Sequence, residues 1–145
     1  IAPAPVMSEE SYRLLIDELP SPIAPGSGST GVQLLLRASV PAFFSAKEAK
    51  PDMHWRVWSD GGKMHVSATN KGTHHLKLTD FTVEGASGAT RIVATGSRAY
   101  VLPGSTLSFE SAEGAPSYPV GTQVTVNAAK GTPYVVRQQI VTSAP

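Results

Sequence analysis

The feature that most constrains the fold is a long apolar stretch with strict alternation between Val32 and Val40. Successive side chains of an extended strand point to opposite faces. One face of this stretch carries only apolar side chains, those of Val32, Leu34, Leu36, Ala38 and Val40. The opposite face carries Gln33, Leu35, Arg37, Ser39 and Pro41. A strand this apolar needs cover on both faces, so its own core is expected to bury one face and a partner the other.

The preceding segment, residues 11–19, permits two interpretations. A short helix would group Leu14, Leu15 and Leu19 on one side. A strand would group Tyr12, Leu14 and Ile16 instead. We favour the strand because Pro20 follows it and the surrounding sequence is rich in β patterns. The loop over residues 21–30, rich in Pro, Gly and Ser, would then let the two strands pair.

Turn signals recur at short intervals after a polar segment at residues 47–51, which we interpret as a hinge. Seven strands are predicted beyond it: His54–Trp58, Lys63–Thr69, Leu76–Glu84, Ala99–Leu102, Thr106–Glu110, Gln123–Ala128 and Tyr134–Val141. In the predicted strand Leu76–Glu84, the apolar residues change from even-numbered to odd-numbered positions near Thr79 and Asp80, which predicts a bulge or break there. Gly85 ends that run. This number of strands in roughly 95 residues is typical of an immunoglobulin-like sandwich.

The expected fold class is therefore all-β, with a complete immunoglobulin-like domain over residues 52–145. The first 46 residues supply only two clear strands, too few for a stable sandwich. These two strands either join the second domain or end a first domain whose earlier strands are missing. The hinge favours the second alternative, a truncated first immunoglobulin-like domain over residues 1–46.

Composition excludes several function classes. A formal net charge of +1 argues against an electrostatically driven nucleic-acid binder. The chain has no cysteine, which excludes disulfides, zinc knuckles and thiol catalysis. No apolar run approaches the roughly 20 residues that a membrane-spanning helix needs, so membrane insertion is not expected.

Four segments, in this order, resemble the periplasmic chaperones of the chaperone–usher pathway, which assembles pili and fimbriae. They are SYRLLIDELP at residues 11–20, GVQLLLRASVPAFF at 31–44, NKGTHHLKLTDFTV at 70–83 and YVLPGSTLSFE at 100–110. The first two are similar to the sixth and seventh strands of that family's first domain. SYRLLIDELP, followed by the VPAFF ending, is most similar to the archaic branch of the family.

The resemblance implies donor-strand complementation, in which the chaperone lends its seventh strand to an incomplete pilus subunit. The lent side chains would be those of Val32, Leu34, Leu36 and Ala38, while Leu35 would pack into the chaperone's own core. The family anchors the subunit's terminal carboxylate with an arginine that lies outside this chain and a lysine whose place Pro41 occupies. Arg13 and Arg37 are the nearest basic substitutes.

The partners implied are pilus subunits and an outer-membrane usher, in the periplasm. Self-association through an uncovered donor strand is also expected. An adhesive or ligand-recognition immunoglobulin-like module is the alternative.

Neither a cofactor nor an enzymatic activity is expected, because no phosphate loop or GxSxG nucleophile motif occurs. Metal binding is not expected at the histidines, which are His54, His65, His74 and His75. No HExxH spacing occurs, and adjacent His74 and His75 would point to opposite faces of a strand.

Overall fold

The computed structural model describes residues 8–20, 34–93, 100–130 and 136–145. The described residues form eleven strands and no helix, so the all-β prediction is confirmed. None of them belongs to a helix long and apolar enough to cross a membrane. The chain divides into two compact units: Glu10–Phe44, and Ile1–Glu9 together with Ser45–Pro145. Glu9 thus belongs to the larger unit, although it directly precedes the first strand of the smaller one.

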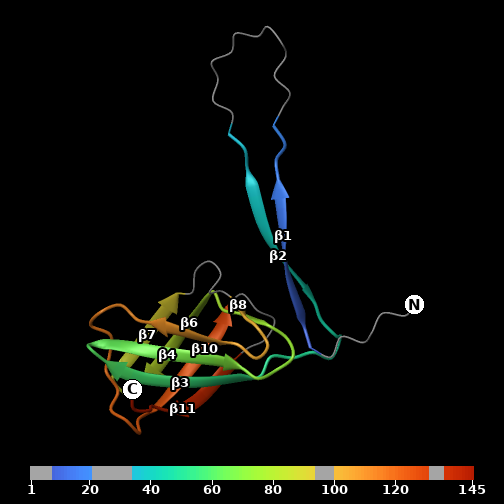
Figure 1. Ribbon diagram of the computed structural model, residues 1–145. Coiled ribbons are helices and arrows are strands. Elements are labelled where there is room, and N and C mark those ends of the chain that lie inside the picture. The colour runs from blue at the N-terminus through green and yellow to red at the C-terminus, as the bar shows by residue number, and fades with distance from the viewer. Residues whose placement is uncertain (1–7, 21–33, 94–99, 131–135) are drawn as a thin grey trace. The chain divides into compact units, whose positions relative to one another are not determined.

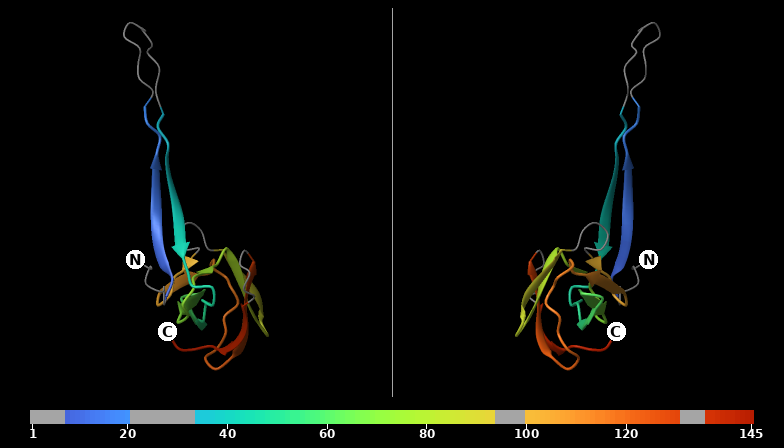
Figure 2. Two further views of the ribbon diagram at one scale, coloured as in Figure 1. Left: turned by 90° about the vertical axis from the view of Figure 1, so that its right-hand side faces the viewer. Right: turned by 90° about the vertical axis from the view of Figure 1, so that its left-hand side faces the viewer.

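The smaller unit is an antiparallel hairpin of β1 (Glu10–Asp17) and β2 (Arg37–Phe44), which run side by side in both views of Figure 2. Its register runs from Glu10 opposite Phe44 to Asp17 opposite Arg37. The strand interpretation of residues 11–19 is confirmed over residues 11–17, and the strand ends at Asp17. The second strand begins later than predicted, since residues 34–36 precede it and 31–33 lie outside the described residues.

The larger unit contains a three-stranded and a four-stranded antiparallel sheet (Figure 1). The first has the order β3 (Met53–Asp60), β4 (Lys63–Asn70), β9 (Thr106–Glu110). The second has the order β11 (Val136–Val141), β10 (Gln123–Lys130), β6 (Asp80–Gly85), β7 (Gly88–Val93). A short pair completes the unit, β5 (Leu76–Lys77) with β8 (Tyr100–Val101).

One hydrophobic core joins the two larger sheets. In β4, which was predicted as Lys63–Thr69, the alternate apolar residues Met64, Val66 and Ala68 are fully buried. Phe81 of β6 lies between two aromatic rings of the other sheet, with centroid distances of 5.3 Å to Trp55 and 5.2 Å to Phe109. Side chains from both sheets thus fill a shared interior, an arrangement consistent with a β-sandwich.

The local sequence pattern was sufficient to predict some of the strand boundaries but not all of the strands. The predicted break near residues 79 and 80 is confirmed, because β5 ends at Lys77 and β6 begins at Asp80. Strand β7 was not predicted; it follows β6 through a tight turn between Gly85 and Gly88, which lie opposite each other. The predicted strands Ala99–Leu102 and Tyr134–Val141 extend outside the described residues, and their described parts form β8 and β11.

Candidate functional site

The β1–β2 hairpin has one face that is almost entirely apolar and one face that mixes polar and apolar residues. Residues directly opposite in an antiparallel pair project to the same side, so the register defines both faces. Apart from Glu10, the first face carries Tyr12, Leu14, Ile16, Ala38, Val40, Ala42 and Phe44. Its large apolar side chains are all substantially exposed, including Val40 at 43%. A two-stranded sheet with an uncovered apolar face is only marginally stable alone, so this face is suited to a partner.

The opposite face holds the two predicted anchors, Arg13 and Arg37. The Arg37 guanidinium pairs with both carboxylate oxygens of Asp17, directly across the hairpin, with Nη2 3.0 Å from Oδ2. Asp17 raises the pKa of the Arg37 guanidinium, because the bond favours the charged form. Arg13 Nη1 donates to the Ser39 hydroxyl at 3.1 Å, and this neutral acceptor does not compensate its charge. Both arginines point away from the face that carries Ala38.

The predicted donor residues that the structure describes lie at the end of the hairpin remote from Phe44. Leu34 is 83% exposed and Leu36 is 74% exposed, and Ala38 is exposed within β2. Val32 lies outside the described residues. Two hydrogen bonds hold the backbone of Leu36 beside Glu18. The Glu18 N–H donates to the Leu36 carbonyl at 2.9 Å, and the Leu36 N–H donates to Glu18 Oε2 at 3.2 Å.

One expectation for this segment does not hold in the structure. Leu35 was expected to pack into the chain's own core, yet it is 52% exposed. The reason is that the described part of the smaller unit consists of two strands and supplies no facing sheet.

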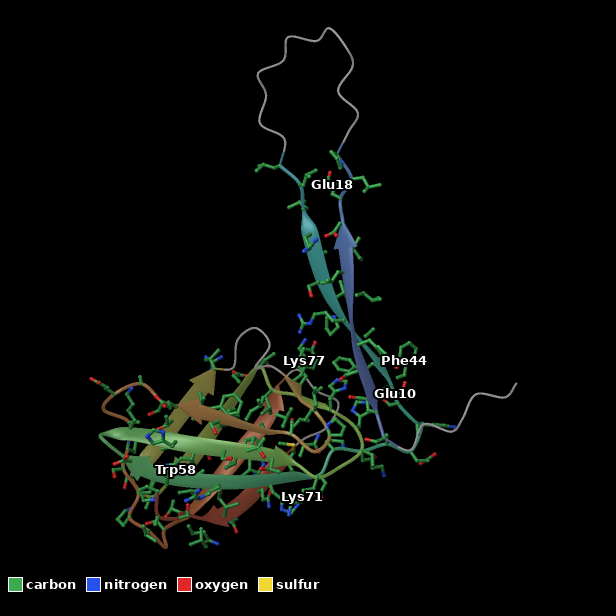
Figure 3. The ribbon with its side chains drawn as sticks, viewed as in Figure 1. Glu10, Glu18, Phe44, Trp58, Lys71 and Lys77 are labelled. Carbon is green, nitrogen blue, oxygen red and sulfur yellow. The ribbon has the colours of Figure 1, made fainter. Side chains whose placement is uncertain are left out.

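Aromatic packing marks the other end of the hairpin. Figure 3 labels Glu10 and Phe44, which lie opposite each other there, and Glu18 beyond the far end of β1. The Tyr12 ring meets the Phe44 ring edge to face at 5.7 Å, and its hydroxyl donates to Glu10 Oε2 at 2.8 Å. The hydrogen bond and the negative charge of Glu10 raise the pKa of Tyr12.

A second cluster, which sequence reasoning missed, lies within the larger unit. The His74 and His75 rings stack with centroids 4.5 Å apart, so the expectation that they point to opposite faces is wrong. The chain bends at residues 72–74, before β5, and strand alternation does not apply there. Glu9 meets both rings, and its carboxylate lies 2.7 Å from His75 Nδ1.

The other two histidines lie apart from this cluster. His54 Nε2 lies 3.3 Å from Asp52 Oδ2, and His65 stacks on Trp58 with centroids 5.3 Å apart. No sequence signal identified Glu9, which is more than 60 residues from the histidine pair.

Comparison with known proteins does not assign this chain to a family. No protein-family model matches it, and no curated protein matches it in sequence. The function of the chain must therefore be inferred from its residues and from the geometry of the hairpin.

Proposed function

We propose that this protein is an assembly chaperone that captures pilus subunits by donor-strand complementation and delivers them to an outer-membrane usher. The observation that carries the proposal is the exposed apolar face of the β1–β2 hairpin, continued by Leu34 and Leu36. In this proposal the larger unit is an immunoglobulin-like domain, and the protein works in the periplasm.

The chemistry of the hairpin suits an incomplete sandwich as the partner. Strand addition gives main-chain hydrogen bonds that tolerate many sequences, and alternating side chains that fill successive pockets set the register. Full burial of one large apolar side chain stabilises by about 1.5 to 3 kcal/mol. Leu34, Leu36 and Val40 still expose 83%, 74% and 43%. Covering these three would therefore contribute about 3 to 6 kcal/mol in total.

Side-chain burial offsets at most the low end of the cost of association, which is about 4 to 15 kcal/mol. The backbone ladder and a charged contact must contribute the remainder. Arg13 and Arg37 are the proposed anchors for the subunit's terminal carboxylate. An incoming carboxylate would replace only a serine hydroxyl at Arg13, whereas at Arg37 it must compete with Asp17.

Co-purification with a pilus subunit tests the proposal. The chain is co-expressed with a chaperone–usher pilus subunit that lacks its final strand, and the captured subunit is quantified. The double variant Leu34→Glu, Leu36→Glu should abolish capture, because two carboxylates cannot enter apolar pockets. Its larger unit should keep its circular dichroism spectrum and unfolding midpoint.

The control variant is Leu15→Glu. Leu15 is 60% exposed and pairs with Ser39, so the control makes the same chemical change on the other face of the hairpin, the one that carries both arginines. It should retain capture. Undiminished capture by the double variant, or equal loss in the control, would refute the donor-strand assignment.

A further inference from the structure

Three potential metal ligands converge in the larger unit, from the segment before β1 and from the turn between β4 and β5. The Glu9 side chain is 0% exposed. Its carboxylate lies 2.7 Å from His75 Nδ1 and 3.5 Å from His74 Nε2. One ligand atom from each residue lies within 4.8 Å of the other two. A buried carboxylate facing two imidazoles is a donor set found in protein metal sites.

The hydrogen bond of His74 Nδ1 leaves the other ring nitrogen facing Glu9. His74 Nδ1 lies 2.7 Å from the His75 carbonyl oxygen, which can only accept, so Nδ1 carries the hydrogen. In neutral His74 the lone pair is then on Nε2, the atom that faces Glu9 Oε2. A lone pair and a carboxylate repel each other unless a proton or a metal ion lies between them.

Hydrogen bonds behind the ligands orient them as an outer shell does in known sites. The bond from His74 Nδ1 to a backbone carbonyl is the usual support of a histidine that binds metal through its other nitrogen. Glu9 is held by the Ser45 hydroxyl, which donates to Oε2 at 2.6 Å, and by the His75 N–H, which donates to Oε1 at 3.1 Å. The carboxylate therefore keeps its orientation independently of its contact with the imidazoles.

We propose that Glu9, His74 and His75 bind one divalent transition-metal ion of the zinc class. Two imidazoles favour such an ion over Mg²⁺ and Ca²⁺, which prefer oxygen ligands. Ligand atoms about 2.0 to 2.1 Å from a tetrahedral zinc lie about 3.3 Å apart. The Glu9–His74 separation of 3.5 Å already matches that spacing, while His75 Nδ1 must give up its bond to Glu9 and move slightly outward.

The coordination has a defined proton balance and a defined effect. Zinc replaces the hydrogen of His75 Nδ1, which shifts to Nε2 of the same ring, while His74 keeps its hydrogen on Nδ1 and binds through the lone pair of Nε2. Three protein ligands leave the fourth position to solvent. The ion would tie the segment before β1 to the β4–β5 turn, and so stabilise the larger unit by mass action.

Zinc titration of the metal-free full chain tests this inference. Calorimetry should show one equivalent of zinc bound, with no uptake of magnesium, and cobalt should give the visible absorption of a tetrahedral site. Zinc at ten times its Kd should raise Tm by about 5 to 10 °C. Glu9→Gln, His74→Ala and His75→Ala should each weaken binding by about tenfold or more.

The matched control is His54→Ala, which removes an exposed histidine outside the cluster and should bind zinc like the unaltered chain. Circular dichroism of each variant in chelator separates loss of binding from loss of folding. Weak, multiple-site uptake, or equal loss of binding in the His54 control, would overturn the inference. So would a folded Glu9 variant with unchanged affinity, because the Glu9 carboxylate would then not be a ligand. The result is independent of subunit capture.

Discussion

Replacing Asn70 by alanine should strongly destabilise the larger unit, because this buried side chain satisfies four backbone groups at once. Its exposure is 0%. Nδ2 donates to the carbonyls of His74 at 2.7 Å and Val101 at 3.0 Å. Oδ1 accepts the N–H groups of Asp52 at 3.1 Å and Gly72 at 2.9 Å. One amide thereby joins the end of β4, the segment before β3, the β4–β5 turn and β8.

The magnitude follows from these four bonds. Each is worth a net 0.5 to 1.5 kcal/mol on average, so losing all four costs about 2 to 6 kcal/mol. Where a freed backbone group stays buried, the cost rises toward the upper end of that range. Since domains of this size are stable by about 5 to 15 kcal/mol, the Asn70→Ala variant should lose a large part of its free energy of unfolding.

Asn70→Asp tests the same geometry with nearly the same shape. One carboxylate oxygen can still accept the two N–H groups, but the other faces the carbonyls of His74 and Val101. This repulsion raises the pKa of the new carboxyl above its usual 3.9 or so. Because the protonated form is favoured in the folded state, its contribution to stability should be fully present below about pH 4 and be lost as the pH rises through that raised pKa.

Urea unfolding followed by tryptophan fluorescence and circular dichroism measures both effects. The control is Gln123→Ala, which removes an exposed amide whose Nε2 donates to Gln139 at 3.4 Å. It should change the free energy of unfolding by less than about 0.5 kcal/mol. An Asn70→Ala variant within 1 kcal/mol of the unaltered protein would refute the reasoning, at the threshold set by a single hydrogen bond.

Two further predictions concern buried hydroxyl groups. Tyr118 is buried, which raises its pKa above 10, and its hydroxyl donates to the Gly88 carbonyl at 2.7 Å. This contribution is present below pH 10 and is lost as the pH rises through the raised pKa. Tyr118→Phe should cost about 1 kcal/mol at neutral pH and reduce the decline in alkaline urea titrations; an unchanged alkaline slope would contradict this. Thr90 Oγ1 is buried without a hydrogen-bond partner among the described residues, so Thr90→Val should stabilise by about 1 kcal/mol in thermal unfolding, and a lower Tm would contradict it.

The elements predictable from the sequence are those whose pattern is local. In β4 the apolar residues Met64, Val66 and Ala68 alternate with polar ones, and the structure buries all three. The change of parity near Thr79 is equally local, and the structure breaks the strand there. Strand β7 gave a weaker signal, because only Thr90 and Ile92 of its six residues are buried and it begins at Gly88, whose φ of +128° few other residues adopt.

The two candidate sites, the hairpin and the histidine cluster, also differ in how local their sequence patterns are. This difference explains why the sequence could reveal the hairpin and not the cluster. The hairpin is encoded by alternation within one strand and a nearby partner, so its apolar series could be identified residue by residue. The histidine cluster depends on a bend at residues 72–74, which removes the alternation on which the prediction for His74 and His75 relied. It also depends on Glu9, whose proximity is a result of packing and has no local pattern. Asn70 also contributes to the cluster, because its amide donates to the His74 carbonyl and thereby holds the turn that brings the two rings together.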